Sequence, residues 1–382
     1  MKIQTLLYRG VLVVALACQL IPGLAFGGEN NTKVSKTINE GYRMPKNGHL
    51  EVTNKYGQVV INNTDSDSVT FSIEIIAYGK DRETANKILD RVDFDFEQTN
   101  EYLGLETVLD RKSGAFKELW NNIGDYSKTL LSKNKLVVNY QINVPKSLTI
   151  EINNKFGDVF MPDRSKKVTI EMSHGNLRAN EFGARSNISV SYGSVEIKRI
   201  HSGHLTFKAA DVTIKNVGNV EIESSSSEIR IDTADDMEII SRSDKSVKLG
   251  SVNRLSGKMN FSNLEIELLN KNIDFDLSYS DIQIDHVPFS FAFMRINGKS
   301  SDISLTFDEK IYMEVDIKAD EEKFNFPYVK LDKERLDDKK GLTRYRGIVG
   351  VKNNYKGDLN IDSQKGAVDI RLKTLQQSVK NK

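Results

Sequence analysis

The five histidines of the chain are its first candidates for metal ligands, and His201 and His204 are the closest pair. Spaced three positions apart on a turn, two imidazoles could reach one metal ion, with His174 supplied by a neighbouring segment. However, no nearby cysteine or carboxylate completes a ligand set, and the spacing matches no zinc motif. The sequence therefore predicts no metal site and leaves His201 and His204 as candidates for an exposed binding surface.

Clustered carboxylates are the second candidate for chemistry. One cluster comprises Asp232, Asp235 and Asp236, and the other comprises Asp274, Asp276, Asp281 and Asp285. A glycosidase needs two carboxylates at a defined separation across a cleft, and the short segments here leave no long loops for cleft walls. Calcium binding would require a glycine-rich repeat motif that the sequence lacks. A carbohydrate-active enzyme using clustered aspartates is thus the alternative, and the main prediction is a protein without catalytic residues.

Other signatures of catalysis are absent from the sequence. It contains no glycine-rich phosphate loop, nucleophile elbow or dinucleotide fingerprint, and Ser224–Ser227 falls at a turn of the repeat described below. The chain has 54 Lys and Arg against 53 Asp and Glu, a net charge of +1, so there is no basic field for a nucleic acid. We expect no enzyme activity, no cofactor and no nucleic-acid partner.

Aromatic residues recur at equivalent places, each directly before a turn. They are Tyr56, Phe156, Tyr192 and Tyr279. The pattern favours an internal stacking ladder that closes one edge of the fold. If the rings faced solvent instead, they would form a stripe suited to stacking on sugar rings, and Tyr192 and Tyr279 are therefore candidates for a binding surface.

Another aromatic cluster lies in residues 112–132, where Trp120 and Tyr126 belong to an apolar pattern with helical spacing. This pattern predicts an amphipathic helix in an insertion, and packing against the neighbouring domain is the favoured interpretation. The alternative is an exposed aromatic face for a partner or a membrane surface, which makes Trp120 and Tyr126 candidate binding residues.

The elements that must position these residues come from a repeat. Each copy has a turn, a polar residue and an apolar-x-apolar triplet, preceded by a second alternating run. The first apolar residues of successive copies are Val159, Leu177, Val195, Val212, Ile229, Val247, Leu264, Ile282 and Ile303. A fixed period of 17–18 residues with period-two alternation predicts an all-β, single-stranded β-solenoid with two short strands per rung. The alternative is a long antiparallel meander of the same strands.

The flanks of the repeat differ from it. Residues 28–140 predict a small α+β cap with a helix over 80–92, which Asp81 would cap. The β-solenoid is expected over 141–319, followed by a charged loop and closing strands over 320–382. Within that last part, the alternating charges of Lys333–Lys340 predict a solvated loop.

The N-terminus reads as an export signal over residues 1–27. Lys2 and Arg9 supply a positive region before an apolar run that starts at Val11, and small residues follow the run. Pro22 breaks the run, which argues against the alternative of a membrane anchor. Lipidation at Cys18 is a second alternative, because Leu16-Ala17-Cys18 is similar to the end of a lipoprotein box. The signal predicts a protein of the periplasm or outer surface of a Gram-negative bacterium, with membrane contact only through the signal or Cys18.

The unit Gly-x-Leu-x-Val-x-Asn-x-x-Gly-x-Val-x-Ile at Gly48–Ile61 resembles the "putative adhesin" family of bacterial envelope proteins, common in Bacteroidetes. The resemblance extends to Ile142-Asn143-Val144-Pro145 and to Ile152–Val159, and it covers nearly all of the chain after the signal. It implies an exported β-helix without established catalytic residues. This chain departs from the pattern by losing the glycine from most middle copies and by carrying the insertion.

These observations predict an exported, non-catalytic envelope protein, an adhesin or binding scaffold that presents a β-solenoid surface to another envelope macromolecule or a glycan. Two alternatives remain open. One is the carbohydrate-active enzyme on the same fold, and the other is a periplasmic scaffold or sensor accessory without a ligand of its own.

Overall fold

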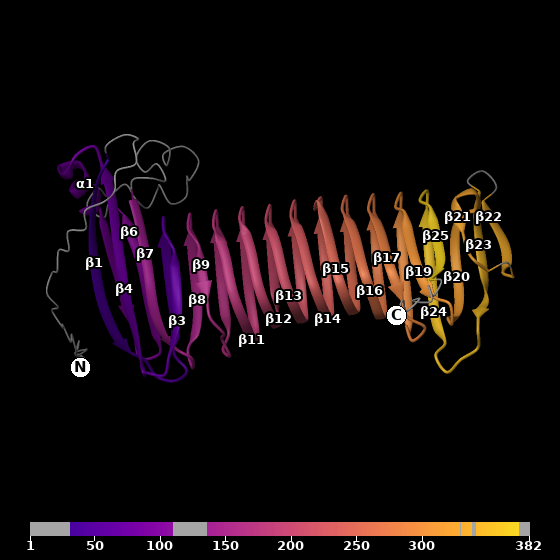
Figure 1. Ribbon diagram of the computed structural model, residues 1–382, viewed down its shortest axis with the longest axis horizontal. Coiled ribbons are helices and arrows are strands. Elements are labelled where there is room, and N and C mark those ends of the chain that lie inside the picture. Colours follow the sequence, from indigo (N-terminus) through magenta and orange to yellow (C-terminus); the bar gives the residue numbers. More distant parts are fainter. Residues whose placement is uncertain (1–30, 110–135, 329, 338–340, 374–382) are drawn as a thin grey trace, which may run out of the picture.

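The structure is a computed structural model that describes residues 31–109, 136–328, 330–337 and 341–373. In this part of the chain the protein is all-β, with one α-helix and one short 3-10 helix. Its strands form a single long, open sheet of 25 strands. Figure 1 shows them as a row that extends along the longest axis of the molecule.

The middle of the molecule consists of parallel strands that follow one another in chain order. These strands are β8 (Thr149–Lys155), β9 (Val159–Met161), β10 (Val168–Ser173), β11 (Asn176–Ser191), β12 (Ser194–Lys208), β13 (Asp211–Ser225), β14 (Glu228–Arg242), β15 (Ser246–Asn260), β16 (Asn263–Ser278), β17 (Asp281–Val287), β18 (Phe293–Lys299) and β19 (Ile303–Asp308). Val195 pairs with Val212, which pairs with Ile229, so residues 17 apart lie side by side. We call each such segment a rung. The pairing is parallel, so the antiparallel meander is wrong for these strands.

Alternation of side chains explains why the rungs stack. In β13, Val212, Ile214, Val217, Val220 and Ile222 are buried, while most of the residues between them are exposed or half-buried. The same inward set in every rung forms one continuous apolar core along the array. Burial of each such side chain stabilises the fold by about 1.5–3 kcal/mol, and a rung achieves that burial only against its neighbours.

The N-terminal end is stacked out of chain order. Its elements are β1 (Thr32–Arg43), β2 (His49–Lys55), β3 (Val59–Thr64), β4 (Ser68–Gly79), α1 (Arg82–Leu89), β5 (Val92–Gln98), β6 (Tyr102–Leu109) and β7 (Leu136–Pro145). Strand β2 lies between β6 and β8, and β3 lies between β7 and β9, all in parallel. Strands β1, β4 and β5 add antiparallel pairs, β1–β4, β4–β7 and β5–β6, at this end.

Helix α1 begins where the sequence predicts a cap. The Asp81 carboxylate accepts a hydrogen bond from the backbone N–H of Thr84 at 2.7 Å, and Ala85 packs into the interior. The helix ends at Leu89, earlier than the predicted residue 92, because Val92 already begins β5.

The C-terminal end repeats the out-of-order stacking. It contains β20 (Tyr312–Asp320), the 3-10 helix η2 (Glu321–Lys323), β21 (Phe324–Asn325), β22 (Asp332–Asp337), β23 (Leu342–Gly350), β24 (Gly357–Gln364) and β25 (Val368–Lys373). Strand β24 lies between β18 and β20, and β25 lies between β19 and β21. In Figure 1 the yellow strands β24 and β25 accordingly stand between orange strands that precede them in the sequence.

The predicted loop over Lys333–Lys340 is a strand in its first half. Residues 332–337 form β22, which pairs antiparallel with β23. Glu334 accepts a hydrogen bond from Arg346 at 3.0 Å, and the Lys333 ammonium lies 5.5 Å from the centre of the Tyr345 ring. The alternating charges thus serve cross-strand pairing on an edge strand, where charged side chains are common.

Several predicted segments lie outside the described residues. They are the export signal over 1–27 with Cys18 and the insertion over 112–132 with Trp120 and Tyr126. Among the helices that the structure does describe, none is long and apolar enough to cross a membrane.

Candidate binding surface

One turn of every rung contains a residue in the left-handed backbone region. We call these residues the turn column; they are Tyr56, Phe156, His174, Tyr192, Ala209, Ser226, Ser243, Phe261, Tyr279, Ser300 and Lys365, with φ between 48° and 70°. Their backbone N–H groups donate along the array, as from Tyr192 to the Lys208 carbonyl at 2.9 Å. The conformation costs a residue other than glycine about 1 kcal/mol. The array must therefore hold each of these residues in place.

The residue after each turn-column position sits where two rungs approach closely. A Cβ atom on Gly157 would lie 1.8 Å from the Gly57 carbonyl oxygen, and one on Gly175 would lie 2.0 Å from that of Gly157. Only glycine fits these early turns. This explains the glycine of the repeat unit at the N-terminal rungs.

Serine takes over this position in later rungs and forms a hydrogen-bonded ladder. The backbone N–H of Ser262 donates to Ser280 Oγ at 3.1 Å, and that of Ser280 donates to Ser301 Oγ at 3.0 Å. Each hydroxyl in turn donates to the carbonyl two residues before it, as Ser280 does to Ser278 at 2.9 Å. Except at Ala210, the glycines missing from the middle copies are thus replaced by a side chain that satisfies a buried backbone donor.

Asp244 occupies the same position in its rung and is 4 % exposed. Its carboxylate accepts hydrogen bonds from the hydroxyls of Ser224 and Ser241 at 2.5 and 2.6 Å, and from the Ser227 N–H at 2.7 Å. Its own N–H donates to Ser262 Oγ at 2.9 Å. Three donors compensate for burial of this carboxylate, which is a structural role.

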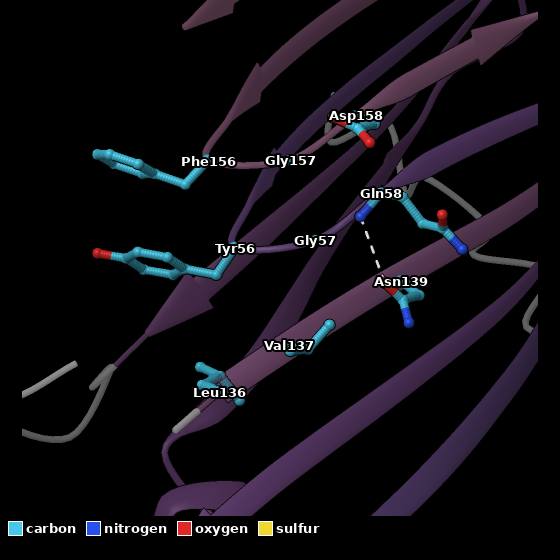
Figure 2. Close-up of a pocket in the computed structure, with 9 residues that line it drawn as sticks. All are labelled: Tyr56, Gly57, Gln58, Leu136, Val137, Asn139, Phe156, Gly157 and Asp158. Atoms are coloured by element: carbon cyan, nitrogen blue, oxygen red, sulfur yellow. Dashed lines mark hydrogen bonds between the residues drawn. The ribbon is translucent and has the colours of Figure 1, made fainter. Parts of the chain in front are cut away.

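Four aromatic side chains of the turn column stack on successive rungs, and we call them the first stack. Ring centroids lie 5.4 Å apart for Tyr56 and Phe156, 4.9 Å for Phe156 and His174, and 5.0 Å for His174 and Tyr192. In Figure 2 the Tyr56 and Phe156 rings lie side by side and point the same way, away from the strands. Stacking contributes about 0.5–1.5 kcal/mol per pair, which offsets the backbone cost at these positions.

A second stack consists of Phe261 and Tyr279, whose centroids lie 5.0 Å apart with ring planes at 7°. These rings and Tyr192 face solvent, with exposed fractions of 59 % for Phe261, 52 % for Tyr279 and 50 % for Tyr192. The predicted stacking ladder exists, but its expected internal position is wrong at these residues; only Tyr56, 8 % exposed, is buried. The exposed rings are the candidate binding surface.

The sequence reasoning missed two members of the stacks. From the sequence, His174 is weighed only as a third ligand beside His201 and His204, and Phe261 is not weighed at all. Both lie at the period of the turn column, 18 residues after Phe156 and 18 residues before Tyr279, and both precede a small residue. Extending the period through every turn would have found them.

Two hollows border the first stack. A cavity of about 370 Å³ is lined by Tyr56, Gly57, Gln58, Leu136, Val137, Asn139, Phe156, Gly157 and Asp158. Figure 2 shows this cavity, where the Gln58 N–H donates to Asn139 Oδ1 at 3.3 Å. Tyr56 and Phe156 of the first stack form part of its lining.

The other hollow, of about 660 Å³, extends from His174 and Tyr192 across charged side chains that include Lys55, Lys155 and Glu106. Burial and the neighbouring Lys155 lower the pKa of Lys55. Burial, together with nearby carboxylates, raises the pKa of Glu106. Such a mixed polar floor beside exposed rings can contact hydroxyl groups as donor and as acceptor.

The histidine pair does not converge on one point. His201 Nε2 lies 2.9 Å from Glu181, and His204 Nδ1 lies 3.4 Å from Glu221, so each imidazole faces a carboxylate of a neighbouring rung. Within the described part of the chain, no group of three or more histidine, cysteine, aspartate or glutamate side chains is arranged to hold a metal ion.

One aspartate of each cluster, Asp236 and Asp274, forms an ion pair with an arginine of the next rung. Arg254 donates to Asp236 at 2.8 and 2.9 Å, and the Nε of Arg295 donates to Asp274 at 2.8 Å. These ion pairs lie on the outer faces of neighbouring strands, which suits cross-strand stabilisation.

No protein-family model and no curated protein matches the chain. Solved structures do. A putative adhesin from Parabacteroides distasonis is 14% identical, covers 72% of this chain and 98% of its own, and has a TM-score of 0.34. A putative adhesin from Bacteroides fragilis is 10% identical, with coverages of 88% and 97% and a TM-score of 0.27. A putative cell adhesion protein from Clostridium sporogenes is 11% identical, with coverages of 88% and 100% and a TM-score of 0.18.

These neighbours have the adhesin names that the sequence resemblance leads one to expect. At such identities and TM-scores, the function has to be argued from the side chains of this chain. The chain is an all-β protein with a long parallel array and aromatic stacks along one edge.

Proposed function

We propose that this chain is a non-catalytic binding protein of the cell envelope, whose exposed aromatic stacks bind a glycan. The single observation that carries the proposal is the exposure of Tyr192, Phe261 and Tyr279, each half or more exposed, along one edge of the array. Exposed apolar rings in a row are costly in water and are typical of ligand-binding surfaces. A pyranose ring presents a face of C–H groups that packs on such a ring while its hydroxyls reach polar neighbours.

The parallel array acts here as a β-solenoid, a rigid support that fixes the spacing of the rings. Each ring is held by a backbone turn with a φ near 50–60° and by its neighbours, so little side-chain freedom is lost on binding. The predicted export signal would place this surface in the periplasm or outside the cell, where envelope polysaccharides are available.

Binding without turnover fits the carboxylates better than hydrolysis does. Asp236 and Asp274 each form an ion pair with an arginine, so both carboxylates are engaged in contacts between neighbouring rungs. The turns between rungs are short and supply no cleft walls around them.

The test compares the wild-type protein with a variant carrying Tyr192→Ser, Phe261→Ser and Tyr279→Ser. Binding to immobilised envelope polysaccharides is measured by biolayer interferometry, and we expect the triple variant to lose at least about tenfold in affinity. The matched control is Ile348→Ser, which removes a side chain of similar exposure, 57 %, at the C-terminal end.

If the control loses as much affinity as the triple variant, or if the triple variant binds like the wild type, the aromatic edge is not the binding surface. Release of reducing sugars that stops in Asp274→Asn would favour the enzyme instead. Protease treatment of intact cells carrying a C-terminal tag then distinguishes the outer surface, where the tag is lost, from the periplasm, where it survives.

A further inference from the structure

The two stacks are separated by three rungs that carry no ring. Their turn-column residues are Ala209, Ser226 and Ser243, which have the same left-handed backbone as Tyr192 and Phe261. The backbone hydrogen bonds continue without interruption, from the Ala209 N–H to Ser225 and from the Ser226 N–H to Arg242. The edge is therefore regular through this stretch, and only the side chains are small. We call this gap the slot.

Ring faces form the two end walls of the slot. Tyr192 stacks on His174 on one side and leaves its other face toward Ala209. Phe261 stacks on Tyr279 and leaves its other face toward Ser243. Four strand spacings of about 4.8 Å separate the two walls, or about 19 Å between ring centres. Allowing for van der Waals contact, a ligand has about 15 Å between them.

Charged side chains of both signs flank the floor of the slot. Lys208 and Arg242 precede turn-column residues, and Asp211, Glu228 and Lys245 follow turn-column residues by two positions. All five are exposed, and in the described part of the chain no salt bridge involves any of them. The flanks thus offer three basic and two acidic side chains around a small floor, a net charge of only +1.

We propose that the slot binds a neutral oligosaccharide that places one pyranose ring on Tyr192 and another on Phe261. The proposal rests on the proposed function and narrows its site to these three rungs. The hydroxyls at the rim of each sugar ring both donate and accept, which matches flanks of mixed sign. The floor consists of one alanine and two serines. An apolar peptide segment would therefore find little apolar surface to bury there, which argues against such a partner.

The separation of the walls dictates the size of the ligand. A single ring that packs on Tyr192 cannot also contact Phe261, about 15 Å away across the slot. A monosaccharide can therefore stack on only one of the two rings, whereas a short oligosaccharide can contact both rings with a single chain. Linking the two contacts should raise the affinity well beyond that for the monosaccharide.

Ser226→Tyr tests the slot directly, because it places a ring in the centre of it. The change suits the fold: Ser226 has φ 54°, and the native tyrosines at 192 and 279 have φ 59° and 50°. The matched control is Ser300→Tyr, which adds the same ring at φ 51° but on the far side of Tyr279, outside the slot. The probes are the monosaccharides and linear tetrasaccharides of glucose, mannose and N-acetylglucosamine, with binding measured by calorimetry.

We expect at least one tetrasaccharide to bind at least about tenfold more tightly than its monosaccharide, and Ser226→Tyr to abolish that difference while Ser300→Tyr leaves it within about twofold. If Ser226→Tyr keeps the wild-type affinity while the triple serine variant loses it, the slot is wrong and the proposed function stands. If no probe and no envelope polysaccharide binds the wild type, both the slot and the proposed function are wrong. Circular dichroism of both tyrosine variants excludes a loss of fold as the cause.

Discussion

The middle of the array and its two ends use the same pleated segments but connect them differently. In the middle, each rung pairs with rungs 17 to 21 residues away in the sequence. At the N-terminal end, His49 contacts Thr149 across 100 residues, and at the C-terminal end, Asp302 contacts Ala367 across 65 residues. The ends are therefore tied by long-range pairing, whereas the middle is held by neighbours in sequence.

This difference shows which part of the fold tolerates change. The middle exchanges glycine for serine or aspartate at its turns and keeps its hydrogen bonds, as at Ser262 and Asp244. At the N-terminal junction, Gly57 and Gly157 have backbone from a distant segment directly beside them, with no room for a side chain. The in-order turn at Gly193 is as tight, with a new Cβ 1.8 Å from the Gly175 carbonyl oxygen, so the early glycine turns tolerate less change than the later serine turns, in chain order or out of it.

The largest expected effect comes from breaking the N-terminal junction with Gly157→Ala. The new methyl group would overlap the Gly57 carbonyl oxygen, so we expect a loss of at least about 3 kcal/mol in the free energy of unfolding. Hydrogen exchange should show lost protection in β2 and β3 and little change in β13 and β14. The control is Gly183→Ala, whose new Cβ would have its nearest atoms at 3.6 Å and which should change stability by less than about 0.5 kcal/mol. Retained protection in β2 would mean that the junction is not a separate weak point.

The next effect tests the middle through Asp244→Ala. Removal of the carboxylate leaves the Ser224 hydroxyl and the Ser227 N–H without their acceptor in the interior and leaves Ser241 with Ser262 Oγ alone, and we expect a loss of about 2–3 kcal/mol in the free energy of unfolding. Urea unfolding measures this loss, with Asp244→Asn as the milder control because it retains one acceptor. If Asp244→Ala leaves the free energy of unfolding unchanged, the buried network does not stabilise the middle rungs.

A smaller effect, the dependence of stability on pH, distinguishes the two ends of the array. The hydrogen bonds from Arg344 lower the pKa of Asp316, so its contribution is present above the ordinary value of 3.8 and is lost as the pH falls through the lowered folded pKa. Asp316→Asn should therefore lower the free energy of unfolding by about 1 kcal/mol at pH 7 and by progressively less below pH 3.8. Denaturant unfolding from pH 7 to pH 3 measures the change; a pH-independent loss would contradict it.

Glu106 at the N-terminal end should respond in the opposite direction. Burial first, and then Asp95 and Glu51, raise its pKa, so the folded state binds a proton at higher pH than the unfolded chain does. Glu106→Gln should raise the free energy of unfolding at pH 7 by less than about 1 kcal/mol, because Glu106 is only partly desolvated and solvent screens its charge. The gain should vanish as the pH falls toward 4.5, the ordinary value. The same unfolding series measures it, and a loss of stability at pH 7 would refute the assignment.

The smallest effect concerns the turn column. Ser226→Gly relieves left-handed strain without removing a stack, so we expect a gain of up to about 1 kcal/mol. Phe261→Gly relieves the same strain but loses the contact with Tyr279, so its net change should be near zero. Parallel urea titrations compare the two; equal gains would show that stacking contributes nothing to stability.

Much of the array could be predicted from the sequence, since a period of 17–18 residues and alternation identify the inward residues of each rung. The place of the copy at Gly48–Ile61 could not, because the repeat does not say that it pairs with residues 149–159. Nor could the direction of the rings. Alternation continues from Val190 to Tyr192 as two inward positions, but the positive φ of Tyr192 turns its ring out to solvent.

The out-of-order strands also bear on synthesis. A nascent chain leaves the ribosome N-terminus first, so β2 and β3 emerge well before their partners β8 and β9. Their edges stay open to other chains during that interval, which is when strand edges are prone to mispair. At the other end, β24 must enter beside β18 and β20, both made earlier. The N-terminal end closes only after Met161 has been made, and the C-terminal end only after Lys373.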